Sequence, residues 1–197
     1  MLDKSVPYKN IIMRVEADRI ADLPQLALPQ GFSLRNYRPG DAENWARIET
    51  SVLEFASEAD ALQYFVKTFL PQEEMLKNRC FFVLNENGLP IATATAWFET
   101  VQNNHRAMVH WVAVCPKYQG LGLGKAVTQA VLRALAELEK GKPVFLHTQT
   151  WSHRAVRMYH GFGFNMVKAE GDYGEAITVL KSVLSEAEVQ ALADTAV

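Results

Sequence analysis

The sequence has little cysteine, little net charge and no long apolar run, and each absence excludes a class of protein. Only Cys80 and Cys115 occur among 197 residues, so neither a disulfide framework nor a metal site is expected. A formal net charge of −2 gives no overall attraction to nucleic acid or to an anionic membrane. No apolar run reaches the ~18 residues of a membrane span, and residues 1–10 are not a signal core. We therefore expect a cytoplasmic, metal-free protein with neither nucleic acid nor membrane as partner.

The amino-acid composition is that expected of one folded domain. Apolar residues make up 49% of the chain, which is enough for a sizeable core at this length. No internal repeat, low-complexity tract or linker divides the chain. Segments with the helical period alternate with segments of the strand period, which predicts a mixed α/β (α+β) fold. One structural domain is expected.

The first half is predicted to contain two helices and three strands. Residues 32–38 are expected to form a strand, which Pro39-Gly40 ends, and Asp41 is a candidate N-cap for the next helix. A second helix is expected to start at Ser57. Strands at 80–84 and 91–98 form a predicted hairpin around Asn87-Gly88. The first helix carries an apolar stripe of Trp45, Ile48, Val52 and Phe55.

The second half alternates in the same way. A strand at 109–114 precedes a helix whose apolar stripe is Val127, Val131, Leu135 and Leu138. A strand at 144–150 and a further helix follow, and 177–181 is the predicted last strand. Ser185 and Glu188 form a predicted capping box for a short C-terminal helix in residues 185–197.

The run Gln119-Gly120-Leu121-Gly122-Leu123-Gly124-Lys125 joins the strand at 109–114 to the next helix. Its three glycines leave backbone amides uncovered at the positive end of that helix, where a diphosphate can approach closely. A phosphate-bearing ligand is therefore expected. The alternative is a glycine-rich turn that only connects two elements.

Two familiar nucleotide loops are excluded by spacing. In a dinucleotide loop, Gly-x-Gly-x-x-Gly, the last glycine would replace Lys125 when counted from Gly120. A P-loop would need a glycine at position 119 and serine or threonine at position 126, where Gln119 and Ala126 stand.

A second motif lies about thirty residues downstream, Ser152-His153-Arg154-Ala155-Val156-Arg157-Met158-Tyr159-His160-Gly161-Phe162-Gly163-Phe164. The glycine run resembles the Gln-x-x-Gly-x-Gly motif of the GCN5-related N-acetyltransferase (GNAT) superfamily. The second run is similar to that family's Asn-x-x-Ala-x-x-x-Tyr-x-x-x-Gly-Phe, with Ser152 in place of the asparagine. A serine hydroxyl can still cap the helix, but the replacement removes an amide contact to the pantetheine arm.

The resemblance implies a GNAT-type fold over residues 31–184, with a mixed, mostly antiparallel central sheet and helices on both faces. Residues 1–30 match no known pattern. We interpret residues 8–15 as an added edge strand, with a dimer contact as the alternative. The protein is expected to be a monomer or a homodimer.

The resemblance also implies acetyl-CoA as the co-substrate and places its site. The backbone of the strand end is expected to pair with the pantetheine arm, and the loop amides are expected to bind the pyrophosphate. Tyr159 is expected to act as the general acid that protonates the leaving thiolate; the alternative is a packing tyrosine. The cofactor-binding residues are Val112, Ala113, Val114, Gln119, Gly120, Leu121, Gly122, Leu123, Gly124, Lys125, Ser152 and Ala155.

The general base is harder to assign. Met108 stands about where some members of the family have a catalytic glutamate, and methionine cannot accept a proton. His110 shares its strand face and titrates near neutrality, so it is the preferred base, although such a histidine can be purely structural. Glu54 and Glu99 are further candidates.

These residues predict an N-acetyltransferase that moves an acetyl group from acetyl-CoA to a primary amine within a ternary complex. The acceptor is a small molecule or a peptide, and the sequence does not identify it. The alternative is a GNAT-like module that binds acyl-CoA for regulation without catalysis.

Overall fold

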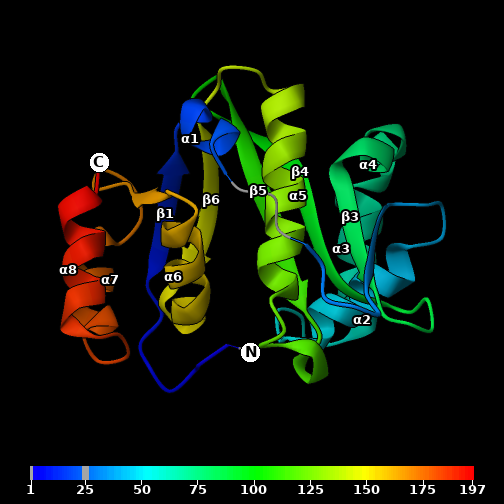
Figure 1. Ribbon diagram of the computed structural model, residues 1–197, viewed down its shortest axis with the longest axis horizontal. Helices are drawn as coiled ribbons and strands as arrows, with labels where there is room; N and C mark the ends of the chain where they lie inside the picture. Colours follow the sequence, from blue (N-terminus) through cyan, green and yellow to red (C-terminus); the bar gives the residue numbers. More distant parts are fainter. Residues whose placement is uncertain (1, 24–26) are drawn as a thin grey trace. The chain divides into compact units, whose positions relative to one another are not determined.

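The computed structural model describes residues 2–23 and 27–197, so residues 1 and 24–26 of the predicted N-terminal extension lie outside the described part. The described residues group into two compact units, and Figure 1 labels their helices and strands. Unit 1 contains residues 2–23, 98–108 and 139–197, and unit 2 contains residues 27–97 and 109–138. Two strands contribute residues to both units.

The strands form a seven-stranded sheet in the order β2-β3-β4-β5-β6-β1-β7. The pairs β2–β3, β3–β4, β1–β6 and β1–β7 are antiparallel. A mostly antiparallel sheet with helices packed against it confirms the predicted α/β class. The strands are β1 (Asn10–Val15), β2 (Ser33–Asn36), β3 (Cys80–Leu84), β4 (Pro90–Val101), β5 (Asn104–Val114), β6 (Val144–Gln149) and β7 (Asn165–Met166).

Helices are interspersed with these strands along the chain. The α-helices are α1 (Ala17–Ala21), α2 (Ala42–Ser51), α3 (Glu58–Thr68), α4 (Glu73–Arg79), α5 (Leu123–Leu138), α6 (His153–Gly161), α7 (Tyr173–Leu180) and α8 (Glu186–Thr195). Short 3-10 turns precede α4, α5 and α6, at Leu70–Gln72, Pro116–Tyr118 and Thr150–Ser152. Helices α1 and α4 were not predicted from the sequence.

In unit 2, β3 and β4 form the predicted hairpin. Gly88 has φ +76° in the turn, and its N–H donates to the Asn85 carbonyl at 2.9 Å. Helix α5 packs on β3, and Val127, Val131 and Leu135 are fully buried. The prediction for Leu138 was wrong: its side chain is 44% exposed, because it is the last residue of α5 and lies beyond the covered stripe.

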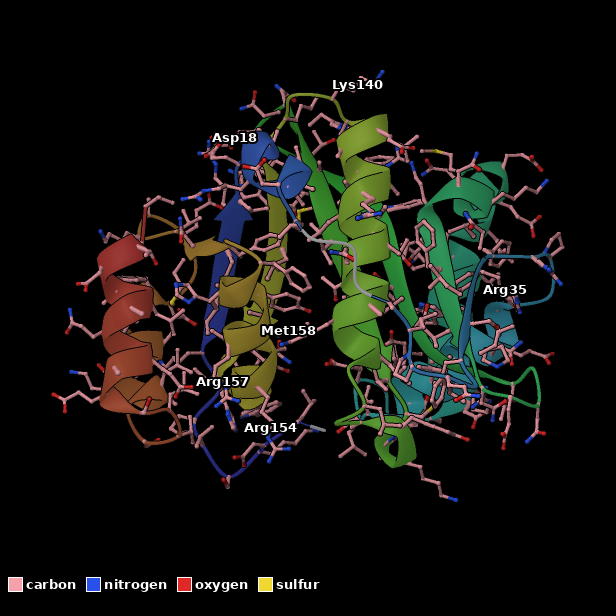
Figure 2. All side chains as sticks on the ribbon, viewed as in Figure 1. Asp18, Arg35, Lys140, Arg154, Arg157 and Met158 are labelled. Atoms are coloured by element: carbon pink, nitrogen blue, oxygen red, sulfur yellow. The ribbon has the colours of Figure 1, made fainter. Side chains whose placement is uncertain are left out.

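Asp41 precedes α2, but its side chain does not cap the helix as predicted. Its carboxylate instead accepts two hydrogen bonds from the Arg35 guanidinium, at 2.5 and 2.8 Å, and one from the Arg38 N–H at 2.7 Å. Burial alone would raise the Asp41 pKa, but these hydrogen bonds hold the pKa below its usual range. The pair therefore joins α2 to β2, where Figure 2 labels Arg35.

In unit 1, β1 confirms that the N-terminal segment contains a strand but not that it is an edge strand. It pairs with β6 over Asn10–Val15 and with the two-residue strand β7 on its other side. Four of its six residues are buried. An apolar strand of this kind is covered on both edges because unpaired backbone groups there would be costly.

The predicted last strand at 177–181 was also wrong. Residues 173–180 form helix α7, in which Ala176 and Leu180 are fully buried one helical turn apart. A short apolar run fits either period, and here packing of the helical face decides. The predicted capping box of α8 is confirmed by reciprocal bonds between Ser185 and Glu188.

Both cysteines are buried free thiols. Burial raises the pKa of the Cys80 thiol to about 12, so it remains protonated at neutral pH. Within the described ranges, no helix is long and apolar enough to cross a bilayer, and no cluster of potential metal ligands is found.

Candidate functional site

The glycine run forms a loop that is tied to the end of β5. The Gln119 side-chain amide donates to the Val114 carbonyl at 2.9 Å. The Tyr118 N–H donates to the Cys115 carbonyl at 2.9 Å, which closes the turn between the strand and the loop. The first residue of the motif therefore fixes the loop to the strand that precedes it.

Gly120 and Gly122 have φ values of +83° and +80°, a conformation that favours glycine. An added Cβ at either position would meet nothing within 4 Å, so backbone conformation rather than packing requires glycine there. Both glycines and Leu121 are exposed. The loop thus presents bare peptide groups to solvent.

Helix α5 begins directly after this loop. The Ala126 N–H donates to the Gly122 carbonyl at 3.1 Å, and the amides before it precede the helix's own ladder of hydrogen bonds. Partial positive charge therefore gathers at residues 120–125, where a phosphate is stabilised by both amides and helix dipole. Lys125 is exposed in this first turn and can add a full charge.

The end of β5 has an unusual backbone. Trp111 has φ +51°, a left-handed conformation that is strained for a bulky residue. After it, Val112 and Val114 are partly exposed and Ala113 is buried. The Cys115 N–H donates to the Ile91 carbonyl at 2.8 Å, which anchors the strand end to β4.

The predicted base, His110, lies in unit 2 among aromatic side chains. Its ring centroid is 5.8 Å from that of Trp111 and 6.3 Å from that of Phe69. Met108 belongs instead to a small buried cluster of unit 1 with Ile12 and Phe145.

The predicted acid, Tyr159, lies on α6 in unit 1. Its side chain is 7% exposed, and its ring meets that of Phe164 edge-on at 6.0 Å. Ala155 is on the same helix. Ser152 precedes it but makes no capping hydrogen bond, contrary to our expectation, because residues 150–152 form a 3-10 turn. Arg154 is exposed in the first turn of α6, as Figure 2 shows.

The predicted site residues fall into two groups, one in each unit. The strand end, the glycine loop and His110 form a continuous part of unit 2. Ser152, Ala155 and Tyr159 form a second group within unit 1.

Of the other base candidates, Glu99 faces His147 with 3.4 Å between Oε1 and Nε2 in unit 1, and Glu54 is exposed. Glu49, which is 1% exposed on α2, was not among the residues predicted from the sequence. Burial, and then the nearby Glu54, raise the pKa of Glu49 well above its usual value. The sequence did contain a signal for this burial, because Glu49 lies one turn after Trp45 and next to Ile48 on the apolar side of the helix.

Comparison with known proteins identifies the family. The model of the acetyltransferase (GNAT) family matches residues 43–164, and the chain belongs to this family. A mycothiol acetyltransferase of Pseudarthrobacter chlorophenolicus is 30% identical over 158 residues, which are 78% of this chain and 49% of the relative. The chain thus spans about half the length of the curated relatives it matches.

Solved structures agree on the fold. A GCN5-related N-acetyltransferase from Sphaerobacter thermophilus matches with a TM-score of 0.61 at 18% identity, covering 81% of this chain and 49% of that one. A GNAT-family acetyltransferase from Colwellia psychrerythraea also gives 0.61, at 13% identity, with 84% and 55% covered.

Proposed function

We propose that this protein transfers an acetyl group from acetyl-CoA to a primary amine by direct attack in a ternary complex. The observation that carries the proposal is the exposed loop of Gly120 and Gly122 at the start of α5, tied by Gln119 to the end of β5. Its bare amides suit the pyrophosphate of the coenzyme. Membership of the GNAT family supports the same co-substrate.

The reaction requires four tasks. The amine nitrogen attacks the thioester carbonyl, the C–S bond breaks, the amine loses a proton and the leaving thiolate gains one. The backbone of Val112–Val114 is proposed to pair with the pantetheine arm. Tyr159 is proposed to protonate the thiolate, and His110 to accept the amine proton directly or through water. Ser152 and Ala155 are proposed to contact the coenzyme.

A lysine-like amine has a pKa of ~10.4, so neutralising it at pH 7 costs about 4.6 kcal/mol. A base or a desolvating pocket has to offset this cost. The relatives are mycothiol acetyltransferases, so the acceptor of those enzymes belongs among the amines to be tested.

The test combines binding with turnover. Coenzyme A should raise the melting temperature, whereas ATP and NAD at the same concentration should not. A panel of primary amines with acetyl-CoA should then release CoA. A melting shift without CoA release from any amine would favour the non-catalytic acyl-CoA-binding module, and no shift with CoA would contradict the proposed loop function.

A further inference from the structure

Unit 2 buries a carboxyl group with one oxygen that has no hydrogen-bond partner among the described residues. Glu49 is 1% exposed, and its Oε1 accepts no hydrogen bond from the described residues. Leaving such an atom without a partner typically costs ~1–3 kcal/mol of stability.

Unit 2 also contains a cluster of four aromatic rings. These are the rings of Trp45, Phe55, Tyr64 and Trp111. Every pair of them is in contact, with ring centroids 5.1 to 6.1 Å apart. Trp45 lies one helical turn before Glu49, so both side chains leave α2 on the same face. Trp45 is fully buried, while the other three rings are partly exposed and can be reached by a ligand.

The cluster also contains unused donors. The indole N–H groups of Trp45 and Trp111 are buried and find no acceptor among the described residues. Two N–H donors of the aromatic cluster and one carboxyl oxygen on the helix face that carries Trp45 are therefore unsatisfied among the described residues. A ligand that pairs with all of them must both donate and accept hydrogen bonds.

A second carboxyl group lies nearby. Glu54 follows the end of α2, and its N–H donates to the Glu49 carbonyl at 3.3 Å. The Glu54 charge acts on Glu49 through space, in the direction expected for two carboxylates in proximity. The Glu54 charge and the negative faces of the aromatic rings favour a cation over a neutral or anionic ligand. A bound cation in turn lowers the pKa of Glu49, so that this carboxyl ionises on binding.

We propose that Glu49 and the rings of Phe55, Tyr64 and Trp111 bind the ammonium group of an acceptor amine that carries a neighbouring hydroxyl or carbonyl oxygen. This subsite rests on the proposed acetyltransferase function. The ammonium donates to the Glu49 carboxyl and lies against the rings, and the neighbouring oxygen accepts from the Trp111 indole N–H. Trp111 directly precedes Val112, where the thioester arm is proposed to bind, so the bound amine lies beside the donor strand.

The test compares matched amines in steady-state kinetics at saturating acetyl-CoA. Ethanolamine is paired with propylamine, and 2-aminocyclohexanol with cyclohexylamine, so that each pair differs by one hydroxyl. Wild-type protein should prefer the hydroxylated member of each pair by about tenfold in kcat/KM, because the analogue leaves the indole donor unpaired.

The variants separate the two contacts. Glu49→Gln should raise the KM of every amine about tenfold or more, as expected for loss of a charge-assisted bond. Trp111→Phe retains a ring and should abolish the preference for the hydroxyl.

The matched controls are Glu43→Gln, on the exposed side of α2, and Trp151→Phe. The indole N–H of Trp151 already donates to the Val6 carbonyl at 2.8 Å. Both controls should retain wild-type KM values.

The outcomes are distinct. A CoA-induced melting shift shows that each variant is folded. If both variants turn over and Glu49→Gln has the same amine KM as Glu43→Gln, the subsite is overturned. The acetyltransferase function is then unaffected. Equal kcat/KM for the members of both amine pairs in wild-type protein overturns the oxygen contact, even where Trp111→Phe does not fold. Absence of CoA release from every amine overturns the proposed function itself.

Discussion

Glu54 donates its backbone N–H to the Glu49 carbonyl at 3.3 Å, and this contact reverses the chain at the end of α2. Together with the bond from Leu53 N–H to the Thr50 carbonyl at 3.0 Å, it forms a Schellman motif. The left-handed position of this motif usually holds glycine, but here it holds Leu53, with φ +71° and 49% exposure. A strained leucine thus brings two carboxyl groups close together.

Replacing Leu53 with glycine should stabilise the protein by about 1 kcal/mol, because the left-handed conformation costs a leucine roughly that amount. Urea unfolding monitored by circular dichroism measures the change. Leu89→Gly is the control, since Leu89 is 45% exposed and has no positive φ; it should not stabilise. Equal effects of the two substitutions would show that Leu53 carries no strain.

Glu49 should make stability fall as pH rises. Burial, followed by the Glu54 charge, raises the folded-state pKa of Glu49 well above the usual 4.5. The folded state therefore retains a proton that the unfolded state has already lost, so this contribution is complete below about pH 4.5 and is lost as pH rises through the folded pKa. Cys80, with a pKa of about 12, remains protonated throughout.

Unfolding free energies of wild type and Glu49→Gln, measured between pH 4.5 and 8, test this sign. The wild type should lose stability relative to the variant as pH rises. Glu43→Gln, on the exposed side of the same helix, should follow the wild-type curve. Parallel curves for wild type and Glu49→Gln would mean that Glu49 has an ordinary pKa.

Tyr159→Phe should lower kcat about a hundredfold or more, because general acid catalysis typically contributes that much. The dissociation constant for CoA should change little, since the ring and its contact with Phe164 are retained. Single-turnover kinetics and calorimetric titration with CoA measure the two quantities. Tyr8→Phe, at a 52% exposed position, serves as control. Wild-type turnover in Tyr159→Phe would remove the tyrosine from the mechanism.

Gly122→Asp should abolish coenzyme binding, because a carboxylate would occupy the space in front of the loop amides and repel the diphosphate. Gly88→Asp serves as the control for backbone strain alone. Gly88 has a similar φ of +76° and similarly open surroundings in the hairpin turn. That variant should bind CoA normally in calorimetric titration. A normal dissociation constant for Gly122→Asp would show that the pyrophosphate binds elsewhere.

Local patterns were predictable where a few adjacent residues decide the conformation. The turn at Gly88, the start of α3 at Ser57 and the capping box of α8 agree with the sequence, because each depends on hydrogen bonds within a few residues. The glycine loop was also predictable, since Gly120 and Gly122 adopt conformations that other residues avoid.

Long-range packing decided the features that were predicted incorrectly. Residues 177–181 contain an apolar run that fits a strand as well as a helix, and burial of Ala176 and Leu180 on one face selected the helix α7. Strand β1 became interior because β7, more than 150 residues later, pairs with its free edge. Asp41 faces Arg35 instead of its own helix for a more local reason, because the guanidinium of Arg35 on the preceding strand β2 offers a charged partner.

By itself, the sequence determined the family, the fold class and the glycine loop, because these follow from short motifs and from periodicity along the chain. Only the tertiary structure decided that Glu49 is a buried carboxyl whose pKa is raised by burial and by the Glu54 charge, on the helix face that also carries Trp45 of the aromatic cluster. A glutamate is ordinarily a solvated residue, and its pKa depends on the burial and the charges that the folded chain brings to it.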